Sequence, residues 1–247
     1  MNNSSHTFSF FIEKLSDFLD CEEIKIADPE IVYRLFGILR SKSGQKIILF
    51  NDTHNCLASI ISCNKKIALI KIEQRNINKT IKPNLIVCIG LIKKPAFEEA
   101  VYACAALGAQ TIIPILSKQV ERNWLGPKEF SRLERVAINA REQAKSFWPT
   151  RISAPINFSE LGLQESLNLN ACKKLVFEKG APKINSKLLG ENIDKNIALI
   201  FGPEAGFVQE ELASLAAQGF ETAGLCPTTL RTEDAVTVAV GLLRSLL

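Results

Sequence analysis

Three short segments of the sequence place glycine, proline and charged side chains directly after apolar runs. They read VFEKGAP (176–182), FGPEAGF (201–207) and LCPTTLRTEDA (225–235). The glycines of the second segment allow positive φ angles or a close approach of the backbone to a ligand, and its proline stiffens the turn. All three segments are therefore candidate ligand-binding loops.

Two of these loops carry polar side chains with further chemical capacity. Glu204 can accept hydrogen bonds from a ligand or from backbone donors, and Arg231 is always positively charged. Thr232 and Glu233 have the residue types that cap a helix. Taken singly, a Gly-Pro turn or a Thr-Glu cap is more often purely structural than part of a ligand site.

Other kinds of site are disfavoured by what the sequence lacks. It contains neither the GxGxxG loop of dinucleotide-binding folds nor the GxxxxGK[ST] loop of phosphoryl-transfer enzymes. Its only histidines are His6 and His54, and none of its seven cysteines forms a CxxC pair. We therefore expect no metal site.

The same composition bears on where the chain works. Seven scattered cysteines, an odd number, favour reduced thiols in the cytoplasm. No segment approaches the ~20 apolar residues of a membrane span. The first 15 residues lack the basic start and long apolar block of a secretory signal. We expect a cytoplasmic protein without a membrane association.

The scaffold for the three loops is predicted beyond residue 81, where apolar runs alternate with helical patterns. The expected strands are 85–92, 111–117, 173–180, 196–202 and 221–226, and the expected helices are 96–108, 128–145, 208–220 and 233–247. This alternation predicts an α/β fold, a parallel sheet with helices on its faces. Ligands bind such sheets beyond the carboxyl ends of the strands, where the three loops begin.

The N-terminal part has a different character. Residues 44–52 and 55–74 contain short β-branched runs separated by turn residues, and only 31–41 is clearly helical. The polar segment 76–84 contains a proline and no apolar periodicity, as expected of a linker. We therefore predict two domains, residues 1–80 and 81–247.

Basic residues recur locally although the net charge is only +4. They gather in 34–46, in 118–145 and at Lys93–Lys94. These charges form either ordinary solvated faces or a surface for RNA, whose phosphates require Lys and Arg on one surface. Charge alone leaves both interpretations open.

Two motifs that follow one another in the sequence favour the RNA-binding interpretation. LIFGPEAGFVQEEL (199–212), followed by GFETAGLCPTTLRTEDAV (219–236), closely resembles the C-terminal signature of the 16S ribosomal RNA (uracil-N3)-methyltransferase family, of the SPOUT class. ILRSKSGQKIILFND (38–52), LGAQTIIPILS (107–117) and AREQA (140–144) resemble further family segments. The signature is matched at Gly202, Pro203, Glu204, Gly206, Phe207, Glu211, Gly219, Phe220, Leu225, Leu230, Arg231, Glu233 and Ala235.

This resemblance implies a fold and an activity. Residues 81–247 would form a SPOUT methyltransferase domain with a C-terminal trefoil knot, preceded by a small PUA-like, RNA-binding β-barrel in residues 1–80. The enzyme would be a homodimer that uses S-adenosyl-L-methionine, without a metal, to methylate uracil N3 in 16S ribosomal RNA or in the small ribosomal subunit.

The resemblance also implies roles for individual residues. Arg231 would orient the uracil or stabilise negative charge on its oxygens, and Glu204 would position the loop or the cofactor; the general base is not identified. RNA contacts are expected from Arg34, Arg40, Lys42, Lys46 and Lys93. Cofactor contacts are expected from Phe177, Glu178, Phe201, Gly202, Pro203, Glu204, Gly206, Leu225, Cys226, Pro227, Thr229 and Leu230.

Several positions depart from the family pattern and keep alternatives open. The departures are at Ala103, Ala106, Lys118, Gln119, Ala205, Cys226, Thr228 and Asp234. They affect substrate details and turnover more than cofactor binding. The alternatives are a SPOUT methyltransferase acting on another RNA position, and a diverged homologue that binds ribosomal RNA without efficient catalysis.

Overall fold

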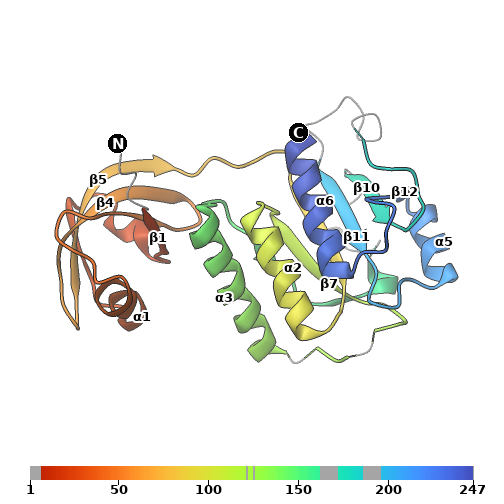
Figure 1. The fold of residues 1–247 in the computed structure, drawn as a ribbon, viewed down its shortest axis with the longest axis horizontal. Helices are drawn as coiled ribbons and strands as arrows, with labels where there is room; N and C mark the ends of the chain where they lie inside the picture. Colours follow the sequence, from red (N-terminus) through yellow and green to blue (C-terminus); the bar gives the residue numbers. More distant parts are fainter. Residues whose placement is uncertain (1–6, 121, 125, 162–171, 186–195, 247) are drawn as a thin grey trace. The chain divides into compact units, whose positions relative to one another are not determined.

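A computed structural model describes residues 7–120, 122–124, 126–161, 172–185 and 196–246 (Figure 1). Contacts divide the chain into two compact units. One comprises Met1–Thr80 with Arg141–Trp148, and the other comprises Ile81–Ala140 with Pro149–Leu247. The segment Arg141–Trp148 thus groups with the N-terminal unit, whereas the sequence placed it in the C-terminal domain.

The first unit is built on a mixed five-stranded sheet in the order β1-β3-β4-β5-β2. β1 pairs with β3 in parallel, and the other pairs are antiparallel. The strands are β1 (Phe8–Phe11), β2 (Glu23–Ile26), β3 (Lys46–Phe50), β4 (His54–Cys63) and β5 (Ala68–Ile77). Alternate residues of β4, namely Cys56, Ala58 and Ile60, enter the core, as expected of a strand with one buried face.

The helix predicted at 31–41 is found as a short α-helix followed by a π-helical turn. A 3-10 turn (Leu15–Phe18) precedes β2, and α1 spans Pro29–Tyr33, capped by the Asp28 carboxylate, which accepts a hydrogen bond from the Ile31 amide at 2.9 Å. A π-helical turn, Arg34–Ile38, continues it. The helical segment stops there because Arg40 adopts a φ of 47°.

The second unit contains a parallel sheet in the order β12-β10-β11-β6-β7-β8, with β9 also paired to β7. Its strands are β6 (Leu85–Gly90), β7 (Thr111–Leu116), β8 (Arg151–Ile152), β9 (Ile156–Asn157), β10 (Lys173–Phe177), β11 (Ile197–Phe201) and β12 (Glu221–Ala223). The α/β expectation with a parallel sheet is confirmed.

Helices cover both faces of this sheet, so its central strands β6 and β11 are buried on both sides. Val87 and Ile89 of β6 point into a core shared with α2, α3 and α6, whereas Cys88 and Ile200 face α5 and a 3-10 turn at Phe158–Glu160. The helices are α2 (Lys94–Ala106), α3 (Pro127–Ala144), α5 (Gln209–Ala217) and α6 (Thr232–Leu246).

Two predicted strands end early, and this lengthens the loops after them. β10 stops at Phe177 instead of residue 180, and β12 stops at Ala223 instead of residue 226. At Gly224 an added Cβ would lie 2.4 Å from the Ala181 carbonyl oxygen, so the backbones of the first and third loops are in close contact there. Strands β1, β2, β8 and β9 were not predicted.

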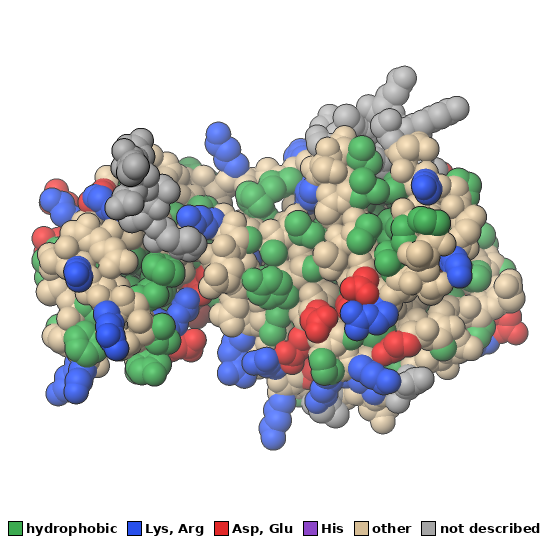
Figure 2. Space-filling model, in the orientation of Figure 1, with side chains coloured by type: hydrophobic (Ala, Val, Ile, Leu, Met, Phe, Trp, Pro, Cys, Tyr) green, Lys and Arg blue, Asp and Glu red, His purple; other side chains and the backbone are tan. Residues whose placement is uncertain are grey.

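The surface of the second unit carries both acidic and basic side chains (Figure 2). Acidic and basic side chains lie beside one another over the lower ends of α2 and α6 (Figure 2). Within the described ranges, no helix has both the length and the apolar character needed to cross a membrane.

Candidate active site

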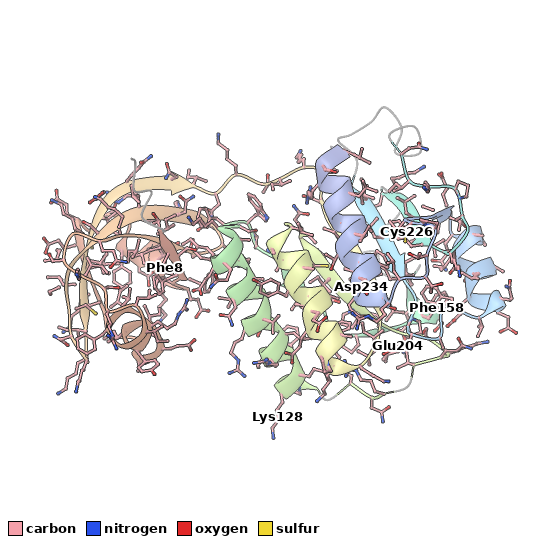
Figure 3. All side chains as sticks on the ribbon, in the orientation of Figure 1. Phe8, Lys128, Phe158, Glu204, Cys226 and Asp234 are labelled. Carbon is pink, nitrogen blue, oxygen red and sulfur yellow. The ribbon has the colours of Figure 1, made fainter. Side chains whose placement is uncertain are left out.

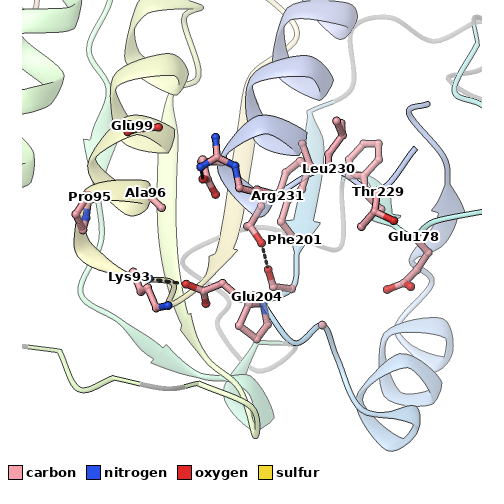
Figure 4. Close-up of a pocket in the computed structure, with 17 residues that line it drawn as sticks. Lys93, Pro95, Ala96, Glu99, Glu178, Phe201, Glu204, Thr229, Leu230 and Arg231 are labelled. Atoms are coloured by element: carbon pink, nitrogen blue, oxygen red, sulfur yellow. Dashed lines mark hydrogen bonds and ion pairs between the residues drawn. The ribbon is translucent and has the colours of Figure 1, made fainter. Parts of the chain in front are cut away.

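A cavity of about 680 Å³ opens at the carboxyl edge of the parallel sheet, where Glu204, Cys226 and Asp234 lie around the loops (Figure 3). Its volume is in the range of small-molecule sites. Four chain segments line it: the start of α2, the end of β10, the turn after β11, and the entry to α6 (Figure 4). The lining side chains are Lys93, Pro95, Ala96, Glu99, Phe177, Glu178, Phe201, Gly202, Pro203, Glu204, Gly206, Thr229, Leu230, Arg231, Thr232, Glu233 and Ala235.

The turn after β11 is held by close backbone packing. The Gly206 amide donates a hydrogen bond to the Pro203 carbonyl oxygen at 2.8 Å, and Gly206 has a φ of 77°. Gly90, at the end of β6, leaves no space for a side chain, because an added Cβ would lie 2.5 Å from the Pro203 nitrogen. At Gly202 an added Cβ would approach the Gly206 Cα to 3.1 Å. Side chains at these glycines would displace the turn itself before they reached a ligand.

Glu204 links this turn to the start of α2. Its Oε1 accepts a hydrogen bond from the Lys93 backbone amide at 2.9 Å, and Lys93 is the residue that precedes the helix. A carboxylate at this position also interacts favourably with the positive end of the helix dipole. Glu204 therefore positions the turn.

Thr232 links the same turn to α6. Its hydroxyl donates a hydrogen bond to the Gly202 carbonyl oxygen at 3.0 Å (Figure 4). The two loops that carry the paired signature are thereby joined through one side chain. In the sequence this threonine has only the appearance of a helix cap.

Arg231 lines the cavity but is held by two carboxylates in the first turn of α6, the helix that follows it. Its Nη1 lies 3.0 Å from Glu233 Oε1, and its Nε lies 3.1 Å from Asp234 Oδ2. The hydrogen bond to Asp234 is the main cause that raises the pKa of Arg231. Since the Arg231 side chain is 73% exposed, part of its guanidinium group stays accessible.

Two phenylalanines form an apolar wall. The rings of Phe177 and Phe201, on neighbouring strands, stack with centroids 4.8 Å apart and an interplanar angle of 10°. Glu178 follows immediately, and burial raises the pKa of its half-buried carboxyl group. A flat apolar wall next to a carboxylate suits a ligand with an aromatic ring and polar groups.

Phe177 of this wall also lines a smaller hollow of about 130 Å³. Leu225 and Cys226 line it, and the Cys226 thiol donates to the Thr228 carbonyl oxygen at 3.2 Å. Pro227 lines neither hollow. Nine of the twelve predicted cofactor contacts thus line the larger cavity, and Leu225 and Cys226 line the smaller hollow.

Two residues that depart from the family pattern support the loops. The Lys118 amide donates to Glu211 Oε1 at 2.8 Å, and Glu211 Oε2 accepts from the Val208 amide at 3.0 Å. With its amide oriented to satisfy both neighbours, Gln119 donates to the carbonyl oxygens of Ala205 and Gly206 at 2.9 and 3.1 Å. Both residues therefore stabilise the segment that follows β11.

The five predicted RNA contacts are divided between the units, four in the first and one in the second. Lys93 lines the cavity of the second unit. In the first unit, Arg34 pairs with Glu142 at 2.6 Å and lies over the Phe10 ring, and Lys46 pairs with Glu73. Arg40 and Lys42 are exposed and have no ion pair with any residue that the structure describes. Within the described part of the first unit, they are the two basic side chains of this set that keep an unmatched charge.

Sequence reasoning missed the contribution of α2. Pro95, Ala96 and Glu99 line the cavity, and Gly90 packs beneath the turn. The sequence pattern could have indicated this contribution, because the carboxyl end of the predicted strand 85–92 lies on the same sheet edge as the three loops. Within the described part of the chain, no group of three or more His, Cys, Asp or Glu side chains could hold a metal ion.

The chain resembles known RNA methyltransferases. A family model described as an RNA methyltransferase domain matches residues 80–244. Ribosomal RNA small subunit methyltransferase E of Synechocystis sp. is 31% identical over 165 residues, which are 64% of this chain and 52%, about half, of that relative. The protein of the same name from Buchnera aphidicola is 29% identical over 240 residues, 94% of this chain and 92% of the relative.

Solved structures agree on the fold. Ribosomal RNA small subunit methyltransferase E from Neisseria gonorrhoeae, bound to S-adenosyl methionine, superposes with a TM-score of 0.84 at 20% identity and covers 98% of both chains. A Legionella pneumophila methyltransferase in complex with the same cofactor gives a TM-score of 0.80 at 21% identity, covering 97% of this chain and 98% of the other. At these identities the likeness establishes the fold.

Proposed function

Because the chain belongs to the RNA methyltransferase domain family, we propose that it transfers a methyl group from S-adenosyl-L-methionine to uracil N3 of a specific uridine in 16S ribosomal RNA. The observation that carries this proposal is the cavity at the carboxyl edge of the sheet. It is built by the two loops of the paired signature, and Thr232 joins them.

The residues of the cavity fit this cofactor. The stacked pair of Phe177 and Phe201 offers an apolar wall to an adenine ring, and the turn at Gly202 brings backbone groups to the lining. Four carboxylates line the cavity against two basic side chains, which suits the positive sulfonium centre. When bound, the cofactor supplies an electrophilic methyl group.

The side chains divide the remaining tasks. Arg231 directs its accessible N–H groups at the uracil oxygens, where negative charge develops when N3 loses its proton. Glu204 keeps the turn attached to α2 through the Lys93 amide. Uracil N3 is engaged in base pairing in a duplex, so the target base must be unpaired or turned out.

We further propose the architecture that the sequence signature implies. Residues 1–80 act as a PUA-like RNA-binding domain, with Arg40 and Lys42 as phosphate contacts, and residues 81–247 form a knotted SPOUT domain. The protein works in the cytoplasm on ribosomal RNA or the small subunit. Homodimer formation through α2 and α6 is supported by a groove that Tyr102 of α2 and Thr237 of α6 line, in which the apolar ring of Tyr102 is 41% exposed.

One observation favours a second candidate, a homologue that binds ribosomal RNA without efficient catalysis. Asp234 stands where the family pattern has threonine, and it holds Arg231 together with Glu233. A guanidinium group shared by two carboxylates interacts less strongly with a third negative charge. This candidate predicts cofactor and RNA binding with little methyl transfer.

A transfer assay separates the two candidates. Purified protein is incubated with methyl-labelled S-adenosyl-L-methionine and with either small ribosomal subunits or naked 16S RNA that lacks the modification. We expect stoichiometric labelling of one uridine, with the methyl group at N3 by mass spectrometry of the nucleosides. Cofactor binding by calorimetry without labelling of either RNA would support the binding protein.

A further inference from the structure

We propose that Glu178 is the general base that removes the N3 proton of uracil, an assignment that rests on the methyl transfer proposed above. The lone pair of this imide nitrogen becomes available to a methyl group only after the proton leaves. The group that accepts the proton must reach the bound base, so it is sought among the side chains of the cavity.

Four carboxylates line the cavity, and three of them are unsuitable. Glu204 accepts a hydrogen bond from the Lys93 amide, and Glu233 is buried against Arg231. Glu99 is exposed to solvent on α2. Glu178 lines the cavity, and its carboxyl group makes no hydrogen bond or ion pair with the residues that the structure describes.

The position of Glu178 is fixed by the sheet. It directly follows β10, and its backbone amide donates to the Ala223 carbonyl oxygen of β12 at 3.1 Å. Its carboxyl group lies beside Thr229, at the opposite end of the pocket from Lys93 (Figure 4). Because the backbone is held, the side chain is a defined acceptor at the edge of the apolar wall.

The surroundings favour a basic carboxylate. Burial raises the pKa of Glu178, and a carboxylate that binds its proton more tightly is the stronger base. Lys179 is its exposed neighbour in the chain, and Cys226 shares the smaller hollow. The other ionisable groups of the cavity are the three carboxylates above, Lys93, and Arg231, whose charge Glu233 and Asp234 already match.

The reaction step balances without another reactant. The Glu178 carboxylate takes the N3 proton, and the N3 electron pair forms a bond to the methyl carbon. The bond between this carbon and sulfur breaks, and its electron pair stays on sulfur, giving a neutral thioether. The protonated Glu178 then returns its proton to water.

The test uses the full chain in single turnovers on small subunits, with saturating S-adenosyl-L-methionine. Glu178→Gln is expected to slow transfer at pH 7 by about a hundredfold or more. Because the cofactor is saturating, the loss of one cavity carboxylate from the cofactor's surroundings does not account for this slower rate. The rate of Glu178→Gln should rise with pH and approach the wild-type rate when uracil ionises unaided. Glu134→Gln, an exposed carboxylate on α3, is the matched control and should keep the wild-type rate.

A more acidic substrate gives a second, independent signature. In RNA transcribed with 5-fluorouridine the N3 proton leaves more easily, so the defect of Glu178→Gln should shrink strongly. Glu178→Asp, which retains a carboxylate, should be intermediate. Equal rates and pH profiles for Glu178→Gln and the wild type would overturn the assignment, and so would a defect confined to cofactor affinity.

A measurement without substrate checks the burial of this group. Since the pKa of Glu178 in the folded protein is raised above its ordinary value of 4.5, ionisation of this group destabilises the fold as the pH rises through that pKa. The free energy of unfolding of Glu178→Gln should therefore rise relative to that of the wild type between pH 4.5 and 7. A difference between the two free energies that does not change with pH would count against the assignment. If the wild type itself transfers no methyl group to N3, the proposed function fails, and this assignment fails with it.

Discussion

The Thr232 hydroxyl donates a hydrogen bond to the Gly202 carbonyl oxygen at 3.0 Å, across 30 residues of sequence. This contact joins the turn after β11 to the first residue of α6, and both segments line the cavity. The two halves of the sequence signature therefore form one site.

Loss of this contact should loosen the site. Thr232→Val keeps the side-chain shape but leaves the Gly202 carbonyl oxygen without its donor, which costs about 1 kcal/mol, or roughly fivefold in affinity for S-adenosyl-L-methionine. Thr232→Ser restores the donor and should bind as the wild type does. Isothermal calorimetry measures both, and equal affinities for Val and Ser variants would refute the link.

Gly90 tests the packing beneath the turn. In Gly90→Ala the new Cβ would lie 2.5 Å from the Pro203 nitrogen, so the turn must move and cofactor affinity should fall at least tenfold, by about 1.4 kcal/mol or more. Gly241→Ala is the matched control in α6. Its Cβ would meet only Leu107 Cδ1 at 3.8 Å, and it should leave affinity unchanged while stabilising the helix by about 1 kcal/mol. Gly90→Ala with wild-type affinity would show that the turn tolerates displacement.

Arg231 and Asp234 should have opposite effects on methyl transfer. Arg231→Ala removes the donor for the developing charge and should slow single turnovers roughly a hundredfold, while cofactor affinity changes little. Arg231→Lys should recover only part of the rate, because an ammonium group lacks the planar fork. Asp234→Thr frees one edge of the guanidinium group and should speed transfer roughly two- to fivefold. A wild-type rate in Arg231→Ala would make its role structural.

Basic residues of the first unit should separate into structural and RNA-binding ones. Arg34→Ala leaves Glu142, whose side chain is 4% exposed, without its ion-pair partner and should destabilise the protein by about 2–3 kcal/mol. The double variant Arg40→Gln/Lys42→Gln should leave the unfolding midpoint unchanged, because both side chains are exposed. The double variant should bind 16S RNA more weakly and reduce the slope of log affinity against log salt by roughly 1.5–2.

These measurements require the full chain. An isolated fragment of residues 1–80 would lack Glu142, which binds Arg34 and accepts the Phe11 amide at 2.8 Å. It would also lack Arg141, which pairs with Asp52 at 2.9 Å. An unchanged salt slope in the double variant would mean that Arg40 and Lys42 are merely solvated.

The sequence by itself determined the helices and the five longer strands of the second unit, and the loops that build the cavity, but not the short strands β8 and β9. Its alternating apolar and helical segments specify a parallel sheet, and the carboxyl ends of parallel strands share one edge. The paired motifs then indicated the family. These features are local, so composition and periodicity over short windows reveal them.

Only the tertiary structure decided which side chains bind one another. Glu204 meets the Lys93 amide across 111 residues, Arg34 meets Glu142 across 108, and Arg141–Trp148 joins the N-terminal unit. Such pairs depend on how whole elements pack, which no local pattern encodes. The same packing matches the charge of Arg231 and leaves the carboxylate of Glu178 half-buried at the end of its strand.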